Sequence, residues 1–118
     1  MSYVFEIDGV TVWSPALRVG RVFVGCAQAL AEVVGLPLGF SFNGTDMIEI
    51  DCAELEAFVG AMAQISEPAI THRILNTLVH PVAVPCVVML RRSGRNVPFG
   101  SDPKTLALID EIDATMPR

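Results

Sequence analysis

The chain opens with Tyr3-Val4-Phe5-Glu6-Ile7-Asp8-Gly9-Val10-Thr11-Val12. Two alternating runs lie on either side of the Asp8-Gly9 pair. Because both of these residues accept positive φ angles at low cost, the pair predicts a two-residue turn between strands 3–7 and 10–12. Alternation places Tyr3, Phe5 and Ile7 on one face. The fold therefore begins with a β-hairpin.

The hairpin leads through Trp13 and Ser14 into a helix expected over residues 15–34. Ser14 is a favourable N-cap, Pro15 a favourable first helical residue, and Gly35 a favourable end. The helix has one narrow polar stripe, made of Arg18, Arg21, Gln28 and Glu32. A helix with so little polar surface is covered on most sides. We therefore expect it to be the central helix, packed on the sheet and against another helix or subunit.

Two glycines, Gly20 and Gly25, interrupt this helix, and each costs about 1 kcal/mol relative to alanine. Either a neighbouring backbone approaches closely at these positions, or the helix tolerates them. The sequence leaves both explanations open.

The middle of the chain repeats the opening pattern. Residues 40–42 and 47–50 alternate around Asn43-Gly44, which allows a second short hairpin. Asp51 then caps a helix over 52–65. Its predicted core positions are Leu55, Phe58, Val59, Met62 and Ile65.

The last third of the chain predicts further helices. The first covers residues 69–80. Its inward-facing positions are Ile70, Ile74, Leu75 and Leu78, and its outward-facing positions are His72, Arg73, Asn76 and His80. Pro81 and Pro85 should interrupt the helix. The run that follows, 82–92, fits a helix better than a strand because basic residues and glycine end it. Asp102 caps a final helix, 103–115.

These elements make one α+β domain over residues 1–118. The N-terminal β-hairpin, with the second hairpin as an option, packs with four to five helices around the long apolar helix. Apolar residues make up 52% of the chain before nine glycines are counted, against an average of about 45–50% with glycine included. A small domain has little interior for this surplus, so we expect a face shared with another chain, and a homo-oligomer.

The net charge of −5 suits a basic protein partner better than a nucleic acid, because phosphate neutralisation needs clustered cations. The only cluster is Arg91, Arg92 and Arg95, which we interpret as a solvated helix end. The longest apolar run, 82–90, is too short to cross a bilayer, so no membrane partner is expected.

Three cysteines, Cys26, Cys52 and Cys86, lie in apolar surroundings without short spacing. We interpret them as buried, reduced thiols, which is typical of a cytoplasmic protein. The N-terminus has no basic segment, so no signal peptide is expected.

No nucleophile elbow, phosphate loop, dinucleotide fingerprint or HExxH helix is present. His72 and His80 lie two turns apart on one helix, about 12 Å along its axis, so they cannot share a metal ion. We therefore predict no catalytic residues, no cofactor and no metal. The residues suited to contact a ligand or partner are Trp13, Asp46, Glu49, His72, Arg73, Asn76 and His80.

Two segments carry a family resemblance: Met1–Glu6 with Val12–Gly20, and Met47–Asp51 with the helix that contains Phe58. They resemble a family of small uncharacterised bacterial proteins, DUF6086. The likeness covers about the first 65 residues. It implies a small bacterial cytosolic domain and no particular activity.

The sequence favours a non-enzymatic protein-interaction module that associates with itself and binds a basic protein. An immunity or antitoxin role fits by analogy alone. The alternative is a small enzyme or small-molecule-binding protein with an apolar pocket.

Overall fold

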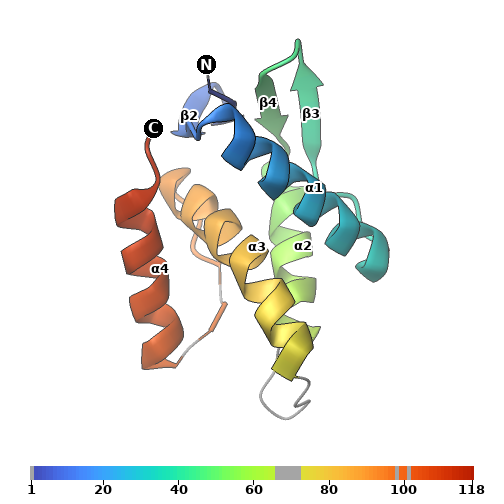
Figure 1. Cartoon of the computed structure of the whole chain (residues 1–118), viewed down its shortest axis with the longest axis vertical. Coiled ribbons are helices and arrows are strands. Elements are labelled where there is room, and N and C mark those ends of the chain that lie inside the picture. Colours follow the sequence, from blue (N-terminus) through green and yellow to red (C-terminus); the bar gives the residue numbers. More distant parts are fainter. Residues whose placement is uncertain (1, 66–72, 98, 101) are drawn as a thin grey trace.

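The computed structural model describes residues 2–65, 73–97, 99–100 and 102–118 (Figure 1). Among these residues it contains four strands and four helices. In chain order they are β1 (Val4–Ile7), β2 (Val10–Trp13), α1 (Leu17–Val34), β3 (Phe40–Asn43), β4 (Met47–Ile50), α2 (Cys52–Ile65), α3 (Arg73–Arg92) and α4 (Pro103–Thr115). The predicted α+β class is confirmed.

Both hairpins form and join into one mixed sheet with the strand order β2-β1-β4-β3. Strands pair antiparallel within each hairpin, while β1 and β4 pair parallel at the centre. Asp8 and Gly9 take φ angles of 52° and 77°, as their turn requires. The inner face of the sheet carries Phe5, Ile7, Ile48 and Ile50, all buried.

Four aromatic rings fasten the sheet to α1. The rings of Phe5 and Trp13 stack with centroids 5.1 Å apart. Phe23, which comes from α1, presents its edge to Trp13 at 5.0 Å and to Phe5 at 5.6 Å, and Phe40 meets Phe5 at 5.7 Å. Edge-to-face rings are favourable because the positive edge of one ring meets the negative face of the other. Trp13 therefore holds the hairpin against α1.

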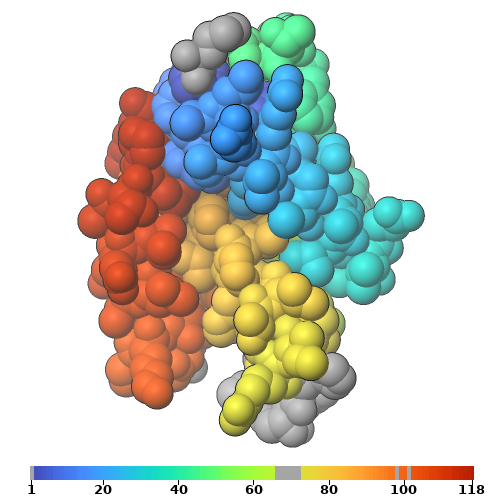
Figure 2. All heavy atoms as spheres, in the orientation of Figure 1, coloured from blue at the N-terminus to red at the C-terminus, as the bar shows by residue number. Residues whose placement is uncertain are grey.

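The most deeply buried helix is α3, not residues 15–34. Nine α3 side chains are buried: Val79, Val82, Ala83, Val84, Cys86, Val87, Val88, Met89 and Leu90. On α1 the buried positions are only Gly20, Phe23, Val24, Ala27 and Ala31. The prediction that 15–34 is the central helix is wrong, because a single face of α1 meets the sheet and α3. In Figure 2, the C-terminal part of α3 (orange) is set back between α1 and α4.

The prolines do not interrupt the helix, since α3 runs continuously from Arg73 through Pro81 and Pro85 to Arg92. The predicted separate helix over 69–80 is wrong in this respect, and residues 66–72 lie outside the described residues. Each proline removes one hydrogen bond from the helix. Burial of the apolar side chains in the second half of α3 offsets that cost.

The predicted inner face at the start of α3 is correct for Leu75, which is half-buried and packs against the core, and wrong for Ile74 and Leu78; Ile70 lies outside the described residues. Ile74 is 68% exposed and Leu78 is 60% exposed, whereas Asn76 and His80 are partly buried. Val79 and Ala83 meet the core, and they lie on a different side of the helix from Ile74 and Leu78.

By length and composition α3 could also cross a bilayer, so the nine-residue run understates its apolar length. Half of this apolar segment is buried within the fold. A core helix of a soluble protein passes the same test, so the finding is weak evidence for a membrane span.

Two of the three predicted helix caps form. The Asp51 carboxylate accepts a hydrogen bond from the Glu54 amide at 3.0 Å, and Asp102 accepts one from the Thr105 amide at 3.0 Å. Hydrogen bonding to Thr105 lowers the pKa of the Asp102 carboxyl. Ser14 does not cap α1, because it continues the extended chain, with its hydroxyl donating to the Tyr3 carbonyl.

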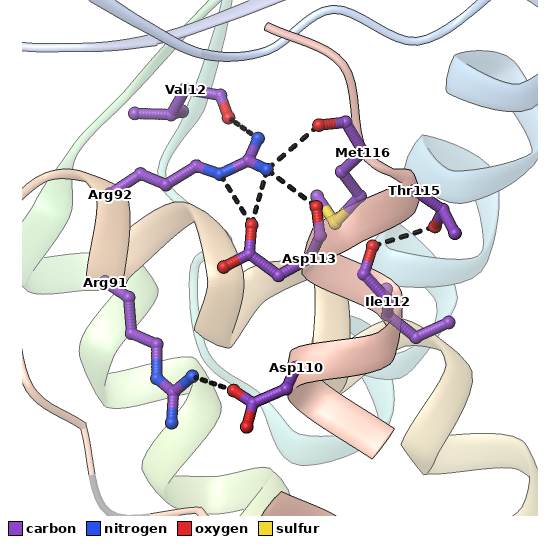
Figure 3. Close-up of polar contacts among 8 residues, drawn as sticks. All are labelled: Val12, Arg91, Arg92, Asp110, Ile112, Asp113, Thr115 and Met116. Carbon is purple, nitrogen blue, oxygen red and sulfur yellow. Dashed lines mark hydrogen bonds and ion pairs between the residues drawn. The ribbon is translucent and has the colours of Figure 1, made fainter. Parts of the chain in front are cut away.

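The guanidinium of Arg92 joins three elements at the end of α3 (Figure 3). It donates to the Asp113 carboxylate, to the Asp113 and Met116 carbonyls at the end of α4, and to the Val12 carbonyl of β2 at 2.8 Å. Its side chain is only 7% exposed. Next to it, Arg91 pairs with Asp110 at the surface. The arginine cluster was predicted to be a solvated helix end, which is wrong for Arg92, because its side chain is buried and links α3 to α4 and β2.

The two glycines of α1 predict opposite effects of alanine. A Cβ at Gly20 would lie 2.2 Å from Cδ2 of the buried Tyr3 ring, whereas one at Gly25 would meet nothing within 4 Å. We expect Gly20→Ala to destabilise the protein by about 1–3 kcal/mol through overpacking. Gly25→Ala should stabilise it by about 0.5–1 kcal/mol. Urea unfolding measures both, and equal stabilisation by the two variants would contradict the packing of α1 on Tyr3.

The arginine pair predicts a contrast between neighbouring positions. Arg92→Met should cost about 2–4 kcal/mol, because three carbonyls and a carboxylate lose their donor. Arg91→Met should cost about 0.5 kcal/mol or less, since an exposed ion pair contributes little. Thermal and urea unfolding measure both effects. Similar losses at the two positions would show that Arg92 does not anchor α4.

Candidate binding face

Two connected hollows lie along α3, with α1 and α4 as their walls (Figure 2). The α3–α4 hollow has a volume of about 800 Å³, and its lining includes Arg73, Asn76, Thr77, His80, Val84 and Leu108. The α1–α4 hollow has a volume of about 560 Å³, and its lining includes Trp13, Val19, Val22, Cys26, Val82 and Met116. Pro81, Pro85 and Ile112 line both. The described surface thus contains a mostly apolar groove.

The two prolines form the floor that the hollows share. They are four residues apart, so they lie one turn apart on the same side of α3. A proline has no amide hydrogen, so Pro81 cannot donate to the Thr77 carbonyl, nor Pro85 to the Pro81 carbonyl. The floor of the groove therefore combines apolar rings with main-chain acceptors.

Apolar side chains with large exposure surround this groove. On α1, Val19 is 53% exposed and Val22 is 62% exposed, and Cys26 is exposed as well. On α3 the exposed apolar residues are Ile74 and Leu78. We call these five residues, with Pro81, the apolar face. The three α1 residues line the α1–α4 hollow together with Pro81, and exposed apolar patches of this kind mark sites of protein or ligand contact.

Three of the predicted contact residues meet in the α3–α4 hollow: Arg73, Asn76 and His80. The Asn76 Oδ1 atom is buried, and no residue in the described part of the chain donates a hydrogen bond to it. Leaving such an acceptor unpaired costs about 1–3 kcal/mol. The His80 ring packs against the Phe99 ring with centroids 5.6 Å apart. The hollow thus offers a mostly apolar surface, with the polar side chain of Asn76 in its lining.

The other predicted contact residues lie elsewhere. Trp13 is 5% exposed and contributes to the α1–α4 hollow. Asp46 lies exposed in the turn between β3 and β4, and Glu49 is exposed on β4, opposite Ser41 of the neighbouring strand. His72 is outside the described residues. The predicted set therefore does not form one site.

The basic cluster is used within the chain. Arg91 and Arg92 pair with residues of α4, and Arg95 pairs with Glu56 of α2. These guanidinium groups therefore hold helices together and are not presented as a group to a phosphate or an acidic partner.

The three cysteines differ in burial. Cys86 is fully buried, and burial raises the pKa of its thiol. Cys52 is half-buried, with its sulfur 3.8 Å from the Ser93 hydroxyl. The expectation that all three are buried is wrong for Cys26, because it lies on the outer side of α1. Within the described part of the chain, no group of three His, Cys, Asp or Glu residues is arranged to hold a metal ion.

The chain matches the family described as "Family of unknown function (DUF6086)" over residues 1–118. The chain belongs to DUF6086. No curated protein and no solved structure matches it. The predicted resemblance is confirmed, and it extends over the whole chain. Membership of DUF6086 assigns no activity, so a function has to be argued from the binding face.

Sequence reasoning identified Arg73, Asn76 and His80 but not the groove that contains them. The missed signal is the Pro81/Pro85 spacing of four residues inside an apolar run. We interpreted it as a break, whereas it marks one face of a continuous helix.

Proposed function

We propose that this protein is a non-enzymatic protein-interaction module that associates with itself through the apolar face on α1 and α3. The observation that carries the proposal is the exposure of Val19 and Val22 in the lining of an apolar groove, with Ile74 and Leu78 also exposed on α3. Removing such side chains from water is the main driving force of protein association. A surplus of apolar residues in the sequence is thereby explained in part as interface.

The positions of the two groups with shifted pKa values, Cys86 and Asp102, support a binding role over catalysis. Catalytic groups with shifted pKa values gather in clefts. Here Cys86 is sealed in the core and Asp102 caps a helix, so both shifts have structural causes. Neither residue is part of the lining of the two hollows.

We further propose a bacterial, cytoplasmic setting, supported by the family resemblance and by three free thiols. The net charge of −5 supports a basic protein as an additional partner, because opposite net charges speed association. The immunity or antitoxin role rests on analogy alone.

Two exposed valines test the self-association. Val22 lies on the apolar face, and Val10, 54% exposed, lies on β2. We expect the protein to form dimers in sedimentation equilibrium, and Val22→Glu to weaken them at least about ten-fold by placing charge in the interface. Val10→Glu is the matched control and should leave the dimer intact. A strictly monomeric wild type, or equal effects of the two variants, would contradict the proposal.

The second candidate function is binding of an apolar small molecule, favoured by the unpaired Asn76 Oδ1 in the α3–α4 hollow. Because this oxygen is buried in the single chain, a ligand with one hydrogen-bond donor would pair with it after the Asn76 side chain turns toward the hollow. Indole is a suitable probe because its apolar ring carries a single N–H.

Nuclear magnetic resonance titration tests this candidate. Indole should shift the Asn76 side-chain amide signal, and Asn76→Leu should weaken indole binding about ten-fold or more. Thr77→Val, in the same hollow, is the control, because the Thr77 hydroxyl already donates to the Arg73 carbonyl. Shifts confined to other parts of the protein would exclude this hollow as the site.

A further inference from the structure

The outer side of α1 carries a second apolar stripe, separate from its core face. It consists of Val19, Val22, Cys26, Ala29 and Val33, all exposed, with Val33 76% exposed. The intervals are three, four, three and four residues, which is the spacing of a coiled-coil seam. The core face uses other positions, Gly20, Phe23, Val24, Ala27 and Ala31. The stripe is therefore free to pack against another helix.

Two opposite charges flank this stripe on one side. Arg18 immediately precedes Val19, and Glu32 immediately precedes Val33; both side chains are exposed. They are 32 − 18 = 14 residues apart, which is about 21 Å along the helix. They are therefore too far apart to pair within one chain.

A second copy of α1 can bring an opposite charge next to each of these residues, but only in one orientation. If two α1 helices lie antiparallel across a twofold axis, Arg18 of each copy faces Glu32 of the other. If they lie parallel, the twofold axis runs along the helices and places these charges on opposite sides of the seam, so neither Arg18 nor Glu32 meets an opposite charge of the other copy. Charge complementarity thus favours an antiparallel pair, and it does so twice because of the symmetry.

The middle of the stripe suits close contact between helices. Cys26 and Ala29 are small, and Gly25 has open space around it. Small residues at the centre let two helix backbones approach, while the valines toward the ends supply apolar contact.

We propose that α1 pairs antiparallel with α1 of a second copy, with the stripe as the seam and Arg18 and Glu32 setting the orientation. This inference rests on the proposed self-association and specifies its partner and geometry. The apolar contacts supply the affinity, and the Arg18–Glu32 charge pairs, which only the antiparallel arrangement forms, set the orientation. The α3–α4 hollow stays outside the seam and remains available for another ligand.

Charge reversal in the full-length protein tests the geometry by sedimentation equilibrium. Arg18→Glu and Glu32→Arg should each weaken the dimer about ten-fold, because like charges then meet twice. The double variant Arg18→Glu/Glu32→Arg restores opposite charges, so its affinity should return to within about three-fold of wild type. Lys104→Glu makes the same charge change at the start of α4, outside the stripe. It should have little effect alone and should not rescue Glu32→Arg.

Each outcome separates this inference from the proposed function. A dimeric wild type with weakened single variants and no rescue in the double variant would overturn the antiparallel pairing but leave self-association intact. Single variants as tight as wild type would overturn the α1 seam. A wild type that stays monomeric would overturn the proposed self-association and this inference together. Circular dichroism confirms that every variant is folded.

Discussion

The Arg92 guanidinium is the interaction on which the arrangement of helices depends. It lies at the C-terminal end of α3, almost without access to water, and binds the end of α4 and the β2 backbone together. A buried cation is costly unless its donors are satisfied, so these partners are held in place around it. The contact fixes one end of α4 against α3 next to the sheet. Toward their other ends the two helices diverge (Figure 1), and the α3–α4 hollow lies between them.

The same arrangement explains why α1 has two apolar faces. Its inner face packs on the sheet through the aromatic cluster around Phe23, while no described element covers Val19, Val22 and Val33. Six half- to three-quarters-exposed valines in a pair of copies contribute on the order of 6 kcal/mol on burial. Association costs about 4–15 kcal/mol in lost freedom. The stripe alone therefore supports weak pairing.

Local chemistry made much of the fold predictable from the sequence. The Asp8-Gly9 and Asn43-Gly44 pairs identified both hairpins, and Asp51 and Asp102 identified the starts of α2 and α4. These signals work because turn and cap residues act on their immediate neighbours.

Properties that depend on tertiary packing were not predictable in the same way. The parallel pairing of β1 with β4 joins strands far apart in the chain, and α3 continues through Pro81 and Pro85 because its second half is buried on several sides. Because of the same packing, Ile74 and Leu78 are exposed, although they were predicted to face inward. Asn76 and His80 were chosen as contact residues for their chemistry, whereas the hollow around them exists only after α3 and α4 pack.

The most direct test of the central claim, that another copy covers the outer side of α1, is the reactivity of the Cys26 thiol. Cys26 lies in the stripe and is exposed in the single chain, whereas Cys86 is sealed in the core and serves as an internal reference. Mass spectrometry would follow N-ethylmaleimide modification of Cys26 at protein concentrations below and above the association midpoint. The account predicts slower modification of Cys26 in the associated protein. A rate that is independent of protein concentration, in a sample shown to be dimeric, would contradict it.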